Sequence, residues 1–290
     1  MKYYQQENKL IVTDFNSFDI EQILECGQCF RFNRLGFKEY VIIAEQKVLH
    51  IEQTEEKISF YPCTEKDFKD IWISYFELDR DYEEIKSILS EKDDVLKQAV
   101  SFAPGIRILR QNPWECLISF IISQNNRIPM IKQVIKNISE KYGTKEGDYY
   151  LFPSINQLES ASEEELSSCK TGFRAKYIID AVKNVLNKNV CFEELKNVST
   201  DIARKKLMEI KGVGEKVSDC VLLFSMDRKE VFPTDVWVKR VMEYFYFDGK
   251  DTKIAHIHEF AEEKFGEYAG FAQQYLFHYA RQKQINTKRK

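Results

Sequence analysis

The 290-residue chain lacks the long apolar runs of membrane proteins. None of its runs reaches the roughly 18 residues that a spanning helix needs. The opening stretch MKYYQQENKLIVTD also lacks the basic-then-apolar order of a secretory signal. We therefore expect a cytoplasmic, soluble protein with no membrane partner. Its 43% hydrophobic content is enough to bury a core for two domains.

The sequence also lacks a disulfide framework and an evident metal site. Its seven cysteines are scattered, and Cys26 and Cys29 form the one close pair. A zinc or redox site would need a second pair or a thioredoxin-like βαβ context, and neither is visible. We expect reduced thiols that pack in the core, and neither a metal nor a cofactor.

A strong excess of one charge is missing as well, since the net charge is −3. This balance alone argues against a nucleic-acid partner, but the charge is unevenly distributed. Residues 1–100 hold 13 Lys and Arg against 21 Asp and Glu, whereas residues 101–290 have a net charge of +5. The second part can therefore present a basic face.

The hydrophobic pattern divides the chain near residue 100. Short segments rich in β-branched and aromatic residues predict antiparallel strands: KLIVTD, CFRFNR, EYVIIAE, KVLHIEQ and KISFYP. After Pro62 the period becomes helical, and these helices are expected to cover one sheet face. From Ile108 onward nearly everything reads as helix. The prediction is an α+β fold, with an antiparallel sheet and helices in residues 1–100 and a mostly α-helical domain in residues 101–290.

Residues 201–225 predict two helices joined by a glycine hairpin. Thr200 can cap the first helix, whose apolar stripe contains Ala203 and Leu207, and the segment KGVG follows. Such a hairpin leaves backbone N–H groups free at the start of the second helix, where a DNA phosphate can bind. An ordinary helix–helix turn is the alternative interpretation.

Two residues near this hairpin suggest chemistry. Lys216 lies in the first turn of the second helix, where the helix dipole disfavours a positive charge. A neutral amine there is a nucleophile that can form a Schiff base with an electrophilic sugar carbon. Asp235 follows a proline and precedes the periodic VWVKRVMEYF, so it stands at a helix start. Its carboxylate can be a plain N-cap or can face a pocket.

The order of hairpin, lysine, proline and aspartate resembles the helix-hairpin-helix Gly/Pro/Asp superfamily of DNA glycosylases. The lysine is typical of its lyase-competent branch, and the likeness is greatest to the 8-oxoguanine DNA glycosylases, from Gly27 to Arg281. The resemblance implies a TBP-like N-terminal domain and a monomer that acts on double-stranded DNA containing 8-oxoguanine. The damaged base would be flipped out and excised, and the strand cleaved by β-elimination.

The catalytic roles follow from the resemblance of GVGEKVSDC and FPTDVW to the family's motifs. Lys216 would be the nucleophile at the deoxyribose C1′ atom. Asp235 would stabilise the developing oxocarbenium charge. The residues that would bind DNA phosphate in the hairpin are Lys211, Gly212, Val213 and Gly214.

The resemblance also implies a pocket for the flipped base. Cys220 and Phe277 would pack on its two faces, and Gln273 would hydrogen-bond its Watson–Crick edge. In GQCFRF, the carbonyl of Gly27 would accept the N7–H that 8-oxoguanine has and guanine lacks. Guanine would place two acceptors face to face in a dry pocket, so a single carbonyl can discriminate strongly.

A further set of residues would act on the DNA around the extruded base. In SFIISQNNRIPM, Asn125 would fill the gap, and in TGFRAKY, Phe173 would wedge into the opposite strand. Arg174 would read the cytosine left unpaired, because guanidinium donors suit the acceptors on its pairing edge.

Four positions depart from the family's pattern, and one of them, Lys211 in place of a proline of the hairpin, should not block phosphate binding. Met130 replaces a second arginine, and because a thioether donates no hydrogen bond we expect a relaxed preference for the opposite base. Trp237 replaces a histidine near the phosphate, and Ala280 replaces that histidine's acidic partner. We expect the indole N–H of Trp237 to contact the phosphate instead.

Other functions remain open at this stage. A glycosylase for adenine or oxidised pyrimidines would usually carry four clustered C-terminal cysteines, and no cysteine follows Cys220. An alkylbase glycosylase would lack Lys216. A non-catalytic DNA-binding module could use the hairpin, but it would have no need for Lys216 and Asp235 together.

Overall fold

The N-terminal part forms one antiparallel sheet in the computed structural model, which describes residues 1–285. Its six strands lie in the order β1-β2-β6-β5-β4-β3. They are β1 Lys2–Gln6, β2 Lys9–Thr13, β3 Phe32–Gly36, β4 Glu39–Ala44, β5 Lys47–Gln53 and β6 Lys57–Tyr61. The five predicted strands are confirmed. The edge strand β1 is additional, because its exposed KYYQQ has no apolar alternation that would reveal it.

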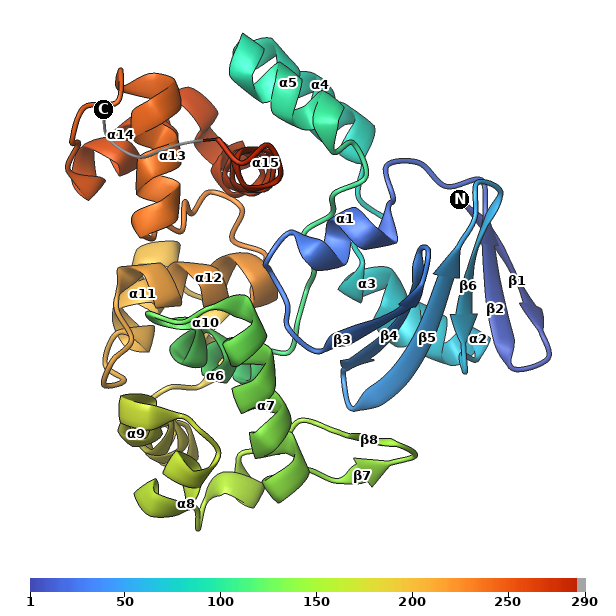
Figure 1. Ribbon diagram of the computed structural model, residues 1–290, viewed down its shortest axis with the longest axis vertical. Coiled ribbons are helices and arrows are strands. Elements are labelled where there is room, and N and C mark those ends of the chain that lie inside the picture. Colours follow the sequence, from blue (N-terminus) through green and yellow to red (C-terminus); the bar gives the residue numbers. More distant parts are fainter. Residues whose placement is uncertain (286–290) are drawn as a thin grey trace.

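The rest of the described chain is mainly helical (Figure 1). The helices are α1 Ile20–Glu25, α2 Glu65–Asp67, α3 Ile73–Tyr75, α4 Tyr82–Lys92, α5 Asp94–Phe102, α6 Pro113–Ser123, α7 Ile128–Tyr142, α8 Glu163–Ser168, α9 Ala175–Leu186, α10 Phe192–Leu195, α11 Thr200–Leu207, α12 Glu215–Ser225, α13 Val236–Tyr246, α14 Ile254–Phe265 and α15 Ala269–Gln282. Short helical turns occupy η1 Phe68–Trp72, η2 Asn156–Leu158, η3 Gly172–Arg174 and η4 Gly266–Tyr268, and a small hairpin pairs β7 Lys145–Glu146 with β8 Tyr149–Tyr150. The predicted α+β class is confirmed.

Capping residues explain where several helices begin. Asn112 accepts hydrogen bonds from the first-turn amides of α6, whose first residue is proline, and Ser162 forms a capping box with Glu165 at α8. The cap of α11 is Ser199, which accepts from Ile202 N at 3.4 Å, and not Thr200 as predicted. The two residues have the same chemistry, so the sequence alone left the position uncertain by one residue.

Two hydrophobic cores meet along the loop between α1 and β3. One core lies under the sheet and contains Cys29, whereas the other joins the helices and contains Cys26 and Phe30. The loop therefore passes from one core to the other within a few residues. It carries Gly27, which the resemblance places in the base pocket.

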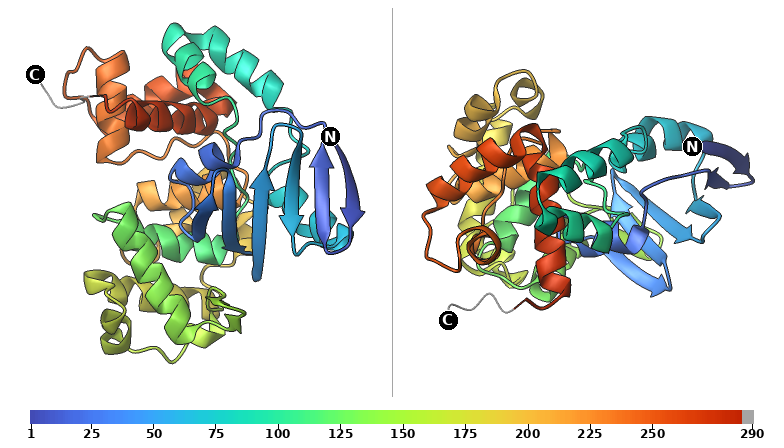
Figure 2. Two further views of the ribbon diagram at one scale, coloured as in Figure 1. Left: turned by 45° about the vertical axis from the view of Figure 1, so that its right-hand side comes forward. Right: turned by 90° about the horizontal axis from the view of Figure 1, so that it is seen from above.

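The helices that follow β6 separate into two groups. The segment α2, η1 and α3 covers the sheet, with Phe68, Trp72 and Tyr75 in the core under it. For α4 and α5 the expected sheet contact is wrong, because their apolar residues belong to the helical core and they lie beside α15 (Figure 1 and Figure 2). Helices from the first 100 residues therefore pack in the core of the helical domain. The domain boundary near residue 100 remains a prediction.

Among residues 1–285, no helix combines the length and apolar character that crossing a bilayer requires. Within the same residues, no group of three or more His, Cys, Asp or Glu is placed to hold a metal ion.

Candidate active site

The predicted helix-hairpin-helix is present between α11 and α12. Gly212 has a φ of +78°, and a Cβ at this position would lie 2.4 Å from the ring of Tyr177. Only glycine fits such a close approach in this backbone region. No side chain caps α12, which begins after Gly214, so its first-turn amides remain available to an anion. The side chain of Lys211 is exposed beside them, and its Nζ lies 3.9 Å from Asp180 Oδ1.

Lys216 projects from the first turn of α12 into a half-buried position. Its Nζ lies 3.5 Å from Ser123 Oγ and 4.9 Å from the centroid of the Phe120 ring. Phe120 in turn stacks on Phe224 with 5.5 Å between centroids and meets Phe30 edge-on at 5.7 Å. The amine therefore lies against an aromatic wall, to which α6, α12 and the loop before β3 contribute. Phe120 and Ser123 were not singled out from the sequence, and only the neighbouring Asn125 gave a signal there.

Cys220 lies one turn beyond Lys216 on the same helix and is buried. Burial raises the pKa of its thiol to about 11, the charge of Lys216 opposes this rise, and the carboxylate of Asp235 adds to it. The thiol stays neutral at physiological pH, as suits a wall that packs against a base.

Asp235 is the N-cap of α13, and its Oδ1 accepts from Val238 N at 2.7 Å. This bond fixes the carboxylate at the start of the helix. Its second oxygen, Oδ2, has no hydrogen-bond donor among the described residues, so one face of the carboxylate remains available. The capping role and the pocket-facing role are compatible in this geometry.

Of the residues predicted to form the base pocket, Gln273 and Phe277 lie on α15 and Gly27 lies in the loop before β3. A Cβ on Gly27, whose φ is +87°, would lie 3.1 Å from Phe277 Cε1. Gln274 Nε2 donates to Cys26 O at 2.8 Å and holds the loop against the helix. Gln273 is buried, and its Oε1 finds no donor among the described residues. A buried acceptor without a partner is costly, and an incoming hydrogen-bond donor would remove that cost, which suits the role predicted for this amide.

The residues predicted to act around the extruded base have different exposures. Met130 and Phe173 are 45% and 48% exposed, and Asn125 is exposed with a φ of +48°. Arg174 is instead buried, and its guanidinium donates to backbone carbonyls of the Asn125 loop. It does not project toward solvent as a free reading group would.

Trp237 does not offer its indole N–H at the surface. Its Nε1 atom is buried and has no acceptor among residues 1–285, so a phosphate contact requires the side chain to rotate. His258 occupies the nearby polar position, with Nε2 3.1 Å from Thr234 Oγ1 and Nδ1 3.4 Å from Glu215 Oε1. The sequence pattern gave no signal for this histidine.

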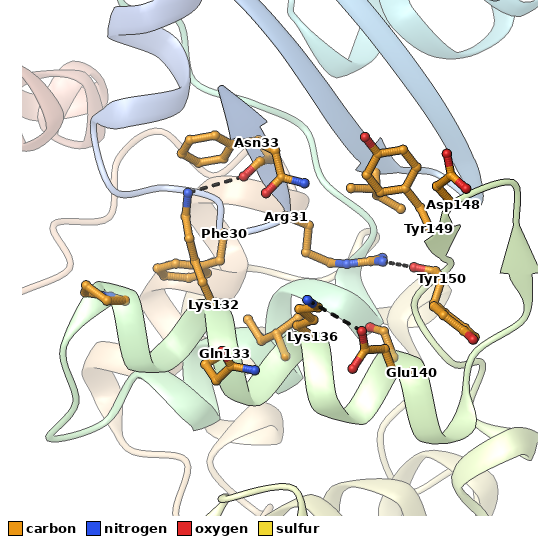
Figure 3. A pocket seen from close by; sticks show the side chains of 15 residues that line it. Phe30, Arg31, Asn33, Lys132, Gln133, Lys136, Glu140, Asp148, Tyr149 and Tyr150 are labelled. Carbon is orange, nitrogen blue, oxygen red and sulfur yellow. Dashed lines mark hydrogen bonds and ion pairs between the residues drawn. The ribbon is translucent and has the colours of Figure 1, made fainter. Parts of the chain in front are cut away.

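A separate cavity of about 320 Å³ lies between β3, α7 and the β7-β8 hairpin (Figure 3). Two of the cationic side chains that line it form ion pairs. Arg31 lies 3.6 Å from Glu115, and Lys136 lies 3.6 Å from Glu140. Lys132 turns to the carbonyl and ring of Phe32. Arg31 and Lys136 are thus each paired with a carboxylate in this structure.

Comparison with known proteins shows the family of the chain. Residues 10–117 match the family model of the 8-oxoguanine DNA glycosylase N-terminal domain, and residues 118–266 match that of the HhH-GPD superfamily base excision DNA repair proteins. A probable N-glycosylase/DNA lyase of Methanothermobacter thermautotrophicus is 31% identical, over 71% of this chain and 72% of its own length. The N-glycosylase/DNA lyase OGG1 of Arabidopsis thaliana is 30% identical, over 87% of this chain and 74% of its own length.

Solved structures give the same result. The 8-oxoguanine glycosylase/lyase of Clostridium acetobutylicum, in complex with double-stranded DNA containing cytosine opposite 8-oxoguanine, superposes with a TM-score of 0.95. The two chains are 43% identical, and the match covers 98% of this chain and 99% of the other. The chain described here belongs to the 8-oxoguanine DNA glycosylases of the HhH-GPD superfamily.

Proposed function

We propose that this protein excises 8-oxoguanine from double-stranded DNA and then cleaves the strand at the abasic site. The observation that carries the proposal is the position of Lys216, whose amine lies against Ser123 and the Phe120 ring from the first turn of α12, one turn before Cys220. It is supported by the family membership and by the glycosylase/lyase activity in the names of the relatives.

The reaction begins when DNA phosphates bind the free amides of the hairpin and the damaged nucleotide is extruded. The base then lies between Cys220 and Phe277, with Gln273 on its pairing edge. Gly27 O accepts N7–H, and guanine lacks that hydrogen. The carbonyl of Gly27 thus distinguishes 8-oxoguanine from guanine.

The amine of Lys216 attacks C1′ in its unprotonated form, and the bond between C1′ and the base breaks. The base leaves with the bonding electron pair and takes up a proton, while Asp235 stabilises the positive charge that develops on the sugar. The amine then gives up one proton, and its nitrogen forms a double bond to C1′ as the C1′–O4′ bond breaks. O4′ keeps the electron pair of that bond and takes up a proton, which leaves a protonated Schiff base on the opened sugar. Removal of a C2′ proton then breaks the C3′–O bond and releases the 3′ phosphate.

We also propose that the enzyme acts as a monomer with a relaxed preference for the base opposite the lesion. Met130 supports this preference, because it is exposed in the first turn of α7 and brings no hydrogen-bond donor to the opposite strand.

The test uses four matched duplexes. The candidate substrate base is 8-oxoguanine opposite cytosine in the first, guanine in the second, adenine opposite 8-oxoguanine in the third and an oxidised pyrimidine in the fourth. The proposal predicts base release and strand cleavage at 8-oxoguanine alone. Cleavage at the pyrimidine alone would indicate another glycosylase specificity, and binding without cleavage of any duplex would indicate a non-catalytic module.

A further inference from the structure

Arg174, at the end of η3, is bound to the backbone of the gap-filling segment, defined here as residues 124–126. Its Nε donates to Gln124 O at 3.0 Å, and its Nη2 donates to Asn125 O at 3.1 Å and also to Gln124 O. Its Nη1 donates to Thr171 O at 3.2 Å. The side chain joins two segments about fifty residues apart and is only 7% exposed.

The segment that it holds needs support. The helix α6 ends at Ser123, so the carbonyls that follow have no helical partner. Asn125 has a φ of +48°, a left-handed conformation that non-glycine residues adopt rarely and that asparagine tolerates best. The guanidinium satisfies these carbonyls, and it thereby fixes the turn that presents the Asn125 side chain.

Few donors are left for reading a base. A guanidinium has five N–H groups, and the bonds to Gln124, Asn125 and Thr171 use four of them. The remaining N–H, on Nη1, cannot satisfy the two acceptors on the pairing edge of cytosine. One face of the guanidinium is also covered by Phe173, whose ring centroid lies 4.4 Å from Cζ.

We propose that Arg174 is mainly a positioning residue, which holds the gap-filling segment in its DNA-ready conformation, and only secondarily a reader of cytosine. The inference rests on the proposed function for its catalytic consequences. It predicts that losing Arg174 weakens excision to a similar degree whichever base lies opposite the lesion. A reader would instead lose activity selectively opposite cytosine.

The test compares Arg174→Gln with wild type in single-turnover excision of 8-oxoguanine opposite each of the four bases. We expect a loss of about tenfold, the scale of a lost hydrogen bond from a charged donor, with similar factors for all four duplexes. Arg174→Lys keeps the charge but not the forked geometry, so it should restore only part of the rate. A loss confined to cytosine, or no loss, would overturn the proposal.

A matched control is Arg127→Gln, which removes a positive charge from the start of α7. The Arg127 side chain is exposed and makes no hydrogen bond or ion pair within residues 1–285. This variant should therefore keep the excision rates near wild type in all four duplexes. If Arg127→Gln lost as much excision activity as Arg174→Gln, the loss of a positive charge would explain the effect. The proposed positioning role of Arg174 would then be wrong.

A second measurement does not depend on activity. Hydrogen exchange of the free protein should show faster exchange in residues 124–126 of Arg174→Gln, while the amides of α12 stay protected and the Arg127→Gln control resembles wild type. An unchanged exchange rate in the gap-filling segment would contradict the proposed positioning role of Arg174. If the wild-type protein excised no 8-oxoguanine, the proposed function would fail, whereas this experiment would still decide the role of Arg174. Global loss of protection would show misfolding, and Arg174→Lys would then be compared instead, with the same expected pattern.

Discussion

The backbone of Gly27 lies against the ring of Phe277, so closely that a Cβ at this position would come within 3.1 Å of Phe277 Cε1. Gly27 also has a φ of +87°. The carbonyl proposed to recognise N7–H and the ring proposed to stack on the base are thus fixed against each other. Glycine is required by the space and by the backbone conformation together.

Replacing this glycine should therefore damage recognition directly. Gly27→Ala strains a left-handed backbone by about 1 kcal/mol and displaces the Phe277 ring. We expect slower excision of 8-oxoguanine with near-normal binding to a duplex that carries an abasic-site analogue. Single-turnover rates and binding titrations measure the two effects. An unchanged excision rate would show that the loop does not form the pocket wall.

The base opposite the lesion should matter more when Met130 is replaced by arginine. The guanidinium of Met130→Arg can donate to the acceptors of cytosine, and one good base contact contributes about 1–3 kcal/mol of discrimination. We expect the ratio of excision opposite cytosine to excision opposite adenine to rise about tenfold. The control Met130→Leu, which also lacks donors, should leave the ratio at its wild-type value. A strict cytosine preference in the wild-type enzyme would contradict the proposed relaxed preference.

A pH effect on stability should arise from His278 on α15. Burial, reinforced by Arg281, lowers the pKa of this histidine to about 4 from an ordinary value of 6.5. The folded state therefore holds the ring neutral, and the stability it contributes is present above pH 6.5 and lost as the pH falls toward 4. His278→Gln should lose less stability than wild type between these values. Denaturant unfolding at several pH values gives the comparison, and parallel profiles would refute the assignment.

Local sequence signals predicted much of the fold. The proline that begins α6, the capping serine of α8 and the glycines before α12 each act within one helical turn, so their effects can be seen in the sequence. The placement of α4 and α5 could not be predicted in this way. Their apolar faces suit the sheet and α15 equally well, and only tertiary packing decides between them.

The site shows the same division. The resemblance assigned Lys216, Cys220 and Asp235 to one site, and in the structure Lys216 and Cys220 lie one turn apart on α12 while Asp235 caps the start of α13. The wall formed by Phe120 and Ser123 depends on a contact across 93 residues, which no local pattern reveals. The burial of Arg174 was also hidden, because FRAKY reads equally as an exposed helix start.

The central claim is that the amine of Lys216 bonds covalently to the deoxyribose. Borohydride reduction during the reaction traps a Schiff base as a stable protein–DNA adduct. We expect wild type to form this adduct with DNA containing 8-oxoguanine. Lys216→Gln should form none while it still binds the same duplex, and retained trapping in this variant would show that another amine is the nucleophile.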